Sequence, residues 1–462
     1  TGPPSLQKTK PRRPCDACRK RKSRCEFSDN DPACVLCRFH RQVCSFDENP
    51  LPRQKRRKLS TPLSAPLPST EDASGAQAVG GSPEPVEERE VPADYATLKG
   101  PSLLKRTLGL QNHRHSRFVG GSSEFEGALV GQLSTRGDEL PLSPDGTASL
   151  HAASLRRVSG AAAFVLLPDT GTLRRGDEAG DADAVERLVG GHGPALVRLY
   201  FRIVHPSFPI LHKRVFLEKY ARSHREFAPP LLAAVYILAL NWWAYSAALA
   251  ARPKPDVRAL ERVALRTMGY VVARPKLSTI QAGLLLLQRP EGDEWALTTK
   301  LVGLGQDLGL HLDCSRWRIP AWEKGLRKRL AWALFMQDKW GALVHGRPSH
   351  ITPADWLVKP VAASDFPESA ADEDDEEGSA EVEKGRVLFS EMIRLTEILA
   401  VVLSEFYTLR AEEEWRARAR EGGRWVLERA KPIQLRLRDW YAALPECLKM
   451  EKVAVRKLSS AG

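Results

Sequence analysis

The N-terminal region contains six cysteines whose spacing repeats. Each half has the form C-x2-C-x6-C, and an eight-residue spacer separates the two halves. Zinc prefers four tetrahedral ligands, and a C-x2-C pair can place two thiolates on one ion with little backbone strain. The repeat therefore predicts a zinc centre. The candidate ligands are Cys15, Cys18, Cys25, Cys34, Cys37 and Cys44.

Six thiolates can hold two zinc ions if two of them bridge, because two tetrahedral ions need eight ligand positions. The symmetry of the repeat nominates the first cysteine of each half, Cys15 and Cys34, as the bridges. The other two cysteines of each half would then complete one ion each. Residues 15 to 44 contain little apolar material, so metal binding would have to drive their folding.

Six cysteines could instead form three disulfides of a small secreted protein. The duplicated spacing, the basic residues between the cysteines and the lack of a secretion signal in this sequence argue against such a protein. We therefore expect a reduced, intracellular, metal-binding segment.

The cysteines are interleaved with basic residues. CDACRKRKSRC, residues 15 to 25, has five basic residues and one acidic one. Residues 1 to 58 hold 16 Lys and Arg against 6 Asp and Glu, and so contribute +10 of the formal +12 of the chain. A short basic segment joined to a nearly neutral body is typical of a polyanion-binding module. A solvated charged face is the alternative, but such runs seldom lie inside a metal-ligand frame.

A second basic run, RQKRRK, follows at residues 53 to 58. Runs of this kind can serve as nuclear localisation signals, add contacts to phosphate, or do both. The candidate nuclear localisation residues are Arg53, Lys55, Arg56, Arg57 and Lys58.

The two halves, PCDACRKRKSRC and CVLCRFHRQVC, resemble the fungal Zn2Cys6 binuclear cluster family of transcription regulators. The resemblance implies that each C-x2-C opens a short helix and that the first helix enters the major groove of DNA over a CGG-type triplet. It places Arg21 and Lys22 in the groove with Lys20 close by, and Arg19 and Arg24 on phosphate. Phosphate contacts fix the register of such a protein, and contacts to base edges give its specificity.

The composition of the rest of the chain separates stretches that should be disordered from a helical domain. Stretches such as STPLSAPLPST and GGSPEPVEERE lack helical periodicity and predict disorder. No sustained heptad pattern follows the cysteines, so dimerisation through a coiled coil is not expected. The expected parts are a disordered basic arm over 1–14, the zinc domain over 15–46, a basic and then Pro/Ser-rich disordered linker over 47–100, a partly ordered connector over 101–182, and an all-helical domain over 183–462.

The helical domain contains an uncharged run from residue 229 to residue 251. The run is long enough to span a bilayer. Asn241 and Ser246 interrupt it, however, and amphipathic helices follow, so we expect one or two buried core helices and no membrane partner. An earlier helix should end near His205, because the following residue is Pro206.

Residues 322 to 351 predict a long amphipathic helix that Gly346 and Pro348 end. Its charged residues, including those of GLRKRL, would form the solvent-exposed face; Glu323, Arg327 and Lys328 lie away from the apolar stripe. The stripe consists of Leu326, Leu330 and Leu334.

Several other segments are assigned no chemistry. His113 and His115 flank an arginine in a polar stretch and are expected on the surface. The acidic stretch 364–384 should be a disordered loop rather than an activation segment, because large apolar residues are nearly absent from it. Cys314 should be a small buried residue. No motif for nucleotide binding or hydrolysis is found, so the chain is not expected to be an enzyme.

HPSFPILHKRVF, residues 205–216, and the stretch 303–351 resemble the fungal-specific regulatory domain found downstream of zinc clusters, which is all-helical. Within this family, three segments are most similar in sequence to the TamA-type activators of nitrogen-source catabolism. They are PCDACRKRKSRC, LLKRTLGLQNHRHSRFVG and PPLLAAVYILALNWW. The fold class implied is a small Zn2Cys6 domain of two short helices and loops, a disordered linker and a large all-α regulatory domain.

The resemblance also implies a function. It is that of a nuclear, zinc-dependent, DNA-binding regulator of RNA polymerase II transcription, an activator or co-activator of genes for nitrogen sources such as amino acids and 4-aminobutyrate. The implied partners are two Zn²⁺, double-stranded DNA, other zinc-cluster transcription factors and the transcription machinery. The alternative is a co-activator that partner zinc-cluster factors recruit without using its own DNA contacts.

Overall fold

The chain forms two compact units, Thr1–Glu90 and Val91–Gly462, and each is described here by itself. In the first unit, the described part of the chain consists of isolated residues around the cysteines. The structure, a computed structural model, describes residues 15–16, 25, 33–34, 37, 43–45, 91–92, 94–123, 139–141, 153–171, 176–289, 294–367, 376–418 and 423–449. The expected arm over 1–14 and most of the expected linker lie outside these residues.

The second unit is built around helix α7, Pro229–Leu240, all of whose residues are buried. Two prolines open this helix, where a missing N–H costs nothing and the fixed φ suits a helix. It packs against α4 (Glu178–Val189), α5 (Gly193–Leu199), α9 (Val257–Val271) and α10 (Leu277–Leu286). The apolar run from residue 229 is therefore a core helix, as predicted, followed by the short α8 (Ala247–Ala250). None of the helices in the described ranges is long and apolar enough to cross a membrane.

A second group of helices surrounds α12, Ala321–His345, which packs on α10, on α11 (Glu294–Asp307) and on α13 (Glu376–Phe406). The helix ends at Gly346, whose φ of 61° is the left-handed conformation that glycine adopts readily. The predicted end and the predicted leucine stripe are both confirmed, since Leu326, Leu330 and Leu334 are buried.

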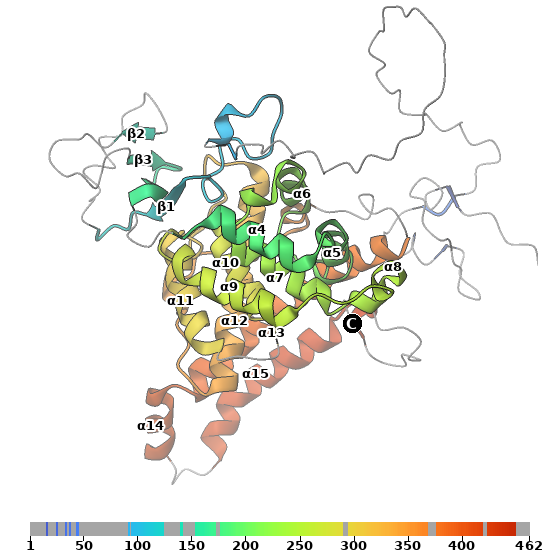
Figure 1. Cartoon of the computed structure of the whole chain (residues 1–462). Coiled ribbons are helices and arrows are strands. Elements are labelled where there is room, and N and C mark those ends of the chain that lie inside the picture. The colour runs from blue at the N-terminus through green and yellow to red at the C-terminus, as the bar shows by residue number, and fades with distance from the viewer. Residues whose placement is uncertain are drawn as a thin grey trace, which may run out of the picture. The chain divides into compact units, whose positions relative to one another are not determined.

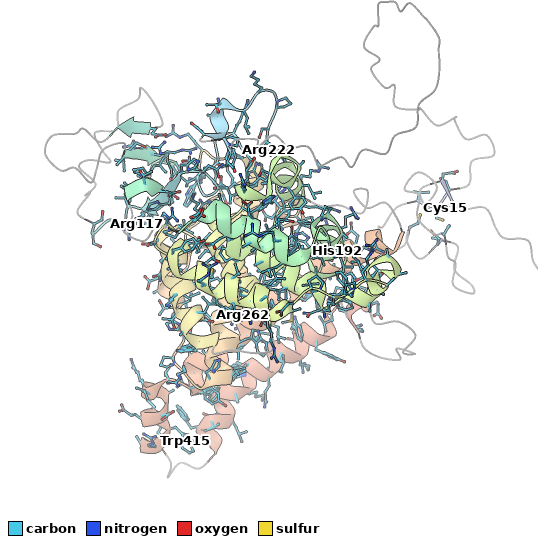
Figure 2. All side chains as sticks on the ribbon, viewed as in Figure 1. Cys15, Arg117, His192, Arg222, Arg262 and Trp415 are labelled. Atoms are coloured by element: carbon cyan, nitrogen blue, oxygen red, sulfur yellow. The ribbon has the colours of Figure 1, made fainter. Side chains whose placement is uncertain are left out.

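The C-terminal helices extend away from this core. α13 packs on α14 (Leu409–Ala417) and α15 (Arg424–Ala442), and α14 lies at the lower end of the body in Figure 1. Trp415 lies on α14 (Figure 2) and is 55% exposed. α13 begins at Glu376, so the acidic stretch expected to be a loop through residue 384 is partly helical.

Short helices complete the body. α5 continues as a π-helical turn, η3 (Tyr200–Val204), and ends at His205 as predicted. α6 (Lys213–Arg222) follows after a loop. The single-turn 3-10 helices are η1 (Tyr95–Thr97), η2 (Asp169–Gly171), η4 (His224–Glu226), η5 (Trp243–Tyr245), η6 (Pro353–Asp355), η7 (Ala363–Asp365) and η10 (Glu446–Leu448).

Residues 114 to 168 contain an antiparallel sheet that was not expected from the sequence. Its strand order is β1-β4-β3-β2, with Phe118 opposite Phe164 and Leu155 opposite Val165. Phe164 also meets Trp317 of the helical body edge-on, with ring centroids 5.2 Å apart. The sheet thus adds a β element to a largely helical unit. The strands are β1 (Arg114–Phe118), β2 (Glu139–Pro141), β3 (Ser154–Arg157) and β4 (Ala163–Pro168).

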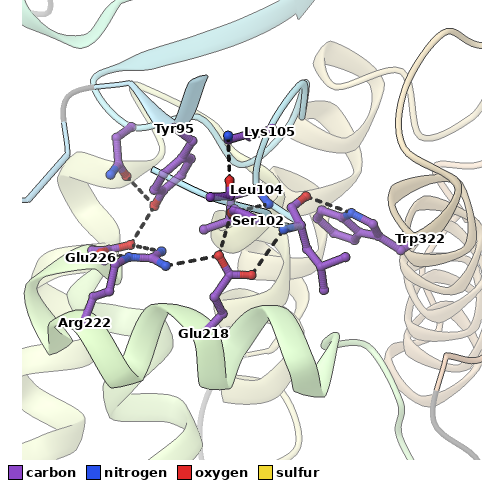
Figure 3. Close-up of polar contacts among 11 residues, drawn as sticks. Tyr95, Ser102, Leu104, Lys105, Glu218, Arg222, Glu226 and Trp322 are labelled. Atoms are coloured by element: carbon purple, nitrogen blue, oxygen red, sulfur yellow. Dashed lines mark hydrogen bonds and ion pairs between the residues drawn. The ribbon is translucent and has the colours of Figure 1, made fainter. Parts of the chain in front are cut away.

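Residues 94 to 112, which we call the strap, cross the surface of α6 and reach α12 (Figure 3). Ser102 Oγ donates a hydrogen bond to Glu218 of α6 at 2.6 Å, and Trp322 Nε1 of α12 donates to the Leu103 carbonyl at 3.0 Å. Leu104 and Leu108 are buried. The strap is therefore packed on the helical body.

The charged residues on α12 correct one expectation. Glu323 and Arg329 are 0% exposed and Arg327 is 2% exposed, whereas the sequence pattern placed the charges of this segment in solvent. Arg327 Nη1 donates to the Leu308 carbonyl at 2.8 Å, and Arg329 Nη1 donates to the Leu211 carbonyl at 3.1 Å. Buried cations of this kind tie loop carbonyls to the helix, because a guanidinium carries five donors in one plane.

His115 also differs from expectation, because it is buried within β1. Its Nδ1 lies 2.8 Å from Asp169 Oδ1, and Lys276 Nζ lies 2.7 Å from Asp169 Oδ2. Burial opposes ionisation of Asp169, but the hydrogen bonds from His115 and Lys276 hold its pKa below the usual range. His113 is exposed, as predicted.

Candidate metal centre

Four of the six N-terminal cysteines form a compact sulfur cluster. The sulfur atoms of Cys15, Cys34, Cys37 and Cys44 all lie within 4.8 Å of one another. Cys15 Sγ is 3.7 Å from Cys34 Sγ and 3.5 Å from Cys37 Sγ. A zinc ion with bonds of ~2.3 Å to four tetrahedral thiolates would place the sulfurs about 3.8 Å apart. The donor set and its spacing therefore fit zinc.

The two cysteine repeats adopt matching local geometry. The backbone N–H of Cys15 donates to Cys25 Sγ at 3.3 Å, and the backbone N–H of Cys34 donates to Cys44 Sγ at 3.4 Å. In each half, the first cysteine thus contacts the third through the same kind of hydrogen bond. Cys37 N–H also donates to Cys34 Sγ at 3.3 Å. N–H donors directed at sulfur favour the thiolate, the form that binds metal.

Burial and mutual proximity oppose charge on these thiols in the absence of a cation. Burial, with a further contribution from Cys15 and Cys34, raises the pKa of Cys25 to about 11 and that of Cys37 to about 12. A divalent cation reverses this balance, since it stabilises coordinated thiolates and releases their protons. Cys25 and Cys44 are free thiols, so neither of them is in the disulfide knot considered as an alternative.

A contact between the two ends of the cluster was not foreseen. Asp16 N–H donates to the Ser45 carbonyl at 2.8 Å, and Ser45 Oγ donates to the Asp16 carboxylate at 3.2 Å. Asp16 directly follows the first cysteine, Cys15, and Ser45 directly follows the last, Cys44. These positions are the signal in the sequence that could have indicated the contact. Asp16 and Cys37 are helical, in keeping with a short helix beginning at each C-x2-C.

The structure thus brings together both predicted bridging cysteines and the two further cysteines of the second half. Cys25 of the first half contacts Cys15. Cys314, in the second unit, is 3% exposed, as expected for a small buried residue. The other predicted site residues lie outside the described residues: Cys18, the DNA-contact candidates Arg19, Lys20, Arg21, Lys22 and Arg24, and the localisation candidates Arg53, Lys55, Arg56, Arg57 and Lys58.

Two protein families match the chain. Residues 13–54 match the fungal Zn(2)-Cys(6) binuclear cluster domain, and residues 197–442 match the fungal specific transcription factor domain. The second match covers more than half of the chain. These families consist of transcription regulators and not of enzymes, which agrees with the prediction from the sequence. No solved structure matches the chain.

Relatives of known name support the same family. The chain is 39% identical over 388 residues to the transcriptional activator protein DAL81 of Saccharomyces cerevisiae, covering 76% of this chain and 39% of the relative. It is 29% identical over 435 residues to a transcriptional regulatory protein of Schizosaccharomyces pombe, covering 86% and 65%. It is 25% identical over 479 residues to the nitrogen assimilation transcription factor nirA of Emericella nidulans, covering 94% and 51%. The chain therefore spans less than two thirds of each relative.

Three findings point to the same family. The sulfur geometry fits zinc, the second unit is largely helical, and both family models match the chain. The zinc cluster implies binding of zinc and of DNA. The chain belongs to the fungal Zn2Cys6 transcription factors, with a binuclear cluster domain at its N-terminal end and a fungal-specific regulatory domain after it.

Proposed function

We propose that the chain regulates RNA polymerase II transcription in the nucleus by binding DNA through its zinc cluster. It acts as an activator or co-activator of genes for the catabolism of nitrogen sources. The observation that carries the DNA-binding part is the cluster of four cysteine sulfurs drawn from both repeats. The nitrogen assignment is supported by similarity to nirA, whose name describes a nitrogen assimilation factor.

The cluster holds two zinc ions in this proposal. Cys15 and Cys34 bridge them, and the 3.7 Å between their sulfurs supports this arrangement. Cys37 and Cys44 complete one ion. Cys25, which contacts Cys15, completes the other together with Cys18.

The DNA contacts are assigned from position in the cysteine frame. Arg21 and Lys22, with Lys20 close by, read a CGG-type triplet in the major groove, and Arg19 and Arg24 contact phosphate. The basic run at residues 53–58 directs the protein to the nucleus and adds contacts to phosphate.

Replacing Lys22 with Ala should weaken binding to a duplex containing a CGG triplet by about 1–3 kcal/mol, a factor of roughly 5 to 150. Fluorescence anisotropy at one fixed salt concentration measures this. Arg19→Ala should instead weaken binding to CGG and scrambled duplexes alike. Lys431→Ala, at an exposed position of α15, is the control and should have no effect. If Lys22→Ala lost equal affinity for both duplexes, the proposed contact of Lys22 with a base edge would be contradicted.

The alternative function is that of a co-activator recruited by partner zinc-cluster factors. It is favoured by the lack of a heptad pattern after the cysteines, since such a pattern would supply a dimer for DNA binding. Cys18→Ala removes a zinc ligand, so a direct DNA binder should lose promoter occupancy in cells. Chromatin immunoprecipitation measures the outcome. Occupancy that persists in the variant would support recruitment and contradict direct binding.

A further inference from the structure

A cavity of about 250 Å³ lies between the strap, α6 and the beginning of α10. At ~30 Å³ per water molecule, this is the space of about eight waters, which suits a small organic molecule. Its apolar wall includes Leu110, Phe227 and Val271. Its polar wall includes Lys219 of α6 and Arg274, which precedes α10.

Lys219 is the most unusual residue of this cavity, because it is a buried cation without a polar partner. It is 8% exposed. Its ammonium lies 5.0 Å from the centre of the Phe227 ring and 5.8 Å from that of Tyr95. Within the described ranges, it makes no hydrogen bond and has no carboxylate oxygen within 4.0 Å. Two aromatic faces offset part of the desolvation, but no described residue accepts a hydrogen bond from this ammonium.

The acidic residues of the cavity are already paired with other cations. Glu226 accepts a hydrogen bond from Arg222 at 2.6 Å and another from the Tyr95 hydroxyl at 3.2 Å (Figure 3). Asp169 is held by Lys276 at 2.7 Å. Glu178 is held by Arg274. Arg225, which also lines the cavity, is paired with Asp183. Among the described cavity residues, Lys219 is therefore the cation that has no carboxylate partner.

Arg274 supplies a second hydrogen-bond donor without a partner in this cavity. Arg274 is 8% exposed, and its Nε–H is buried without a hydrogen-bond partner, while its Nη2 is bound to Glu178. Ser278 lies in the first turn of α10 and lines the same cavity, so the positive end of this helix also faces it. Burial lowers the pKa of Lys219 to about 8, which leaves it mostly charged at neutral pH.

We propose that this cavity binds a small monocarboxylate whose carboxylate group pairs with Lys219. One negative charge matches the one unpaired cation, whereas a phosphate dianion would meet the carboxylates of Asp169, Glu178 and Glu226. The apolar wall fits a short aliphatic chain. The proposal goes beyond transcription regulation through the zinc cluster and does not depend on it.

The test uses the full chain and hexanoate, a monocarboxylate of eight non-hydrogen atoms, as the probe. Isothermal titration calorimetry should show saturable binding of hexanoate to the wild type and none of hexylamine or inorganic phosphate. Lys219→Met keeps the length of the side chain and removes its charge, so it should weaken hexanoate binding at least tenfold. Lys300→Met, at an exposed position of α11, is the matched control and should bind as the wild type does.

A second variant leaves Lys219 in place. Ala179 is an exposed residue of α4 that lines the cavity, and Ala179→Leu should weaken hexanoate binding by filling this space. A stability measurement separates a binding role of Lys219 from a structural one. Because its ammonium lacks a partner, unliganded Lys219→Met should unfold at the same temperature as the wild type or higher, whereas loss of a structural lysine would lower that temperature.

The outcomes are distinct. Saturable hexanoate binding that both variants weaken, with no loss of thermal stability in Lys219→Met, supports the site. Absence of hexanoate binding to the wild type, equal binding by the wild type and both variants, binding of phosphate in its place, or a destabilised Lys219→Met would overturn it. DNA binding is measured separately, so failure here leaves the proposed function standing.

Discussion

Cys34→Ser should remove zinc from both positions of the cluster. Cys34 is fully buried, and its sulfur lies 3.7 Å from Cys15 Sγ, as expected of two bridging thiolates. A serine hydroxyl is a poor zinc ligand at neutral pH, so each ion would keep three ligands instead of four. Structural zinc contributes about 10–16 kcal/mol of apparent binding free energy to small domains of this kind, so its loss should unfold the first unit.

The measurement is zinc content after gel filtration, by plasma emission spectrometry, together with DNA binding by anisotropy. We expect two ions in the wild type, none in Cys34→Ser, and one in Cys44→Ser, because Cys44 is assigned to a single ion. Cys447→Ser is the control, since this cysteine lies far along the chain in the second unit. Equal zinc content in Cys34→Ser and Cys44→Ser would contradict bridging, and one ion in the wild type would contradict the binuclear proposal.

Glu323→Gln should lower the free energy of unfolding by about 3–5 kcal/mol, the usual cost of breaking a buried ion pair. Glu323 is 0% exposed, and its carboxylate accepts from the N–H groups of Leu108 and Gly109, both at 2.9 Å, and from Arg327 Nε at 3.0 Å. A glutamine amide would turn an N–H₂ group toward one of these donors. It would also leave the Arg327 guanidinium buried without its counter-charge.

Urea denaturation of the full chain, followed by circular dichroism, measures the loss. Glu414→Gln is the control on α14, where the pairs with Arg410 and Arg429 are exposed and each worth ~1 kcal/mol or less. Replacing Glu323 by Gln and Arg327 by Met together should recover part of the loss, because no uncompensated charge then remains. A Glu323→Gln protein as stable as Glu414→Gln would show that the buried pair contributes little.

Features encoded by local sequence were predictable. The cysteine frame identified the sulfur cluster because metal-ligand spacing is local and chemically specific. Pro206 and Gly346 marked helix ends for different reasons. Proline disfavours helical backbone angles at the residue before it, and glycine readily adopts the left-handed angles that end a helix. The uncharged run from residue 229 was correctly predicted to be core, because polar residues interrupt it and amphipathic helices follow it.

Features that depend on distant partners were not predictable. β1 has the sequence RHSRF, which lacks an apolar alternation, and it pairs with a strand about 50 residues further along the chain. Glu323 and Arg327 looked like a solvent-exposed face because charge at helical spacing usually is one. The partners of both side chains are distant in sequence: the amides of Leu108 and Gly109, more than 200 residues earlier, bind Glu323, and the Leu308 carbonyl accepts from Arg327.

The strap also determines where the second unit can be truncated. A fragment that starts at residue 183, where helical periodicity begins, would lack Leu104, Leu108 and the two amides that Glu323 binds. It would expose an apolar surface and leave a buried carboxylate short of donors. Deletion mapping of transcriptional activity with such fragments would measure misfolding in place of regulation, so the shortest piece worth testing begins before Asp94.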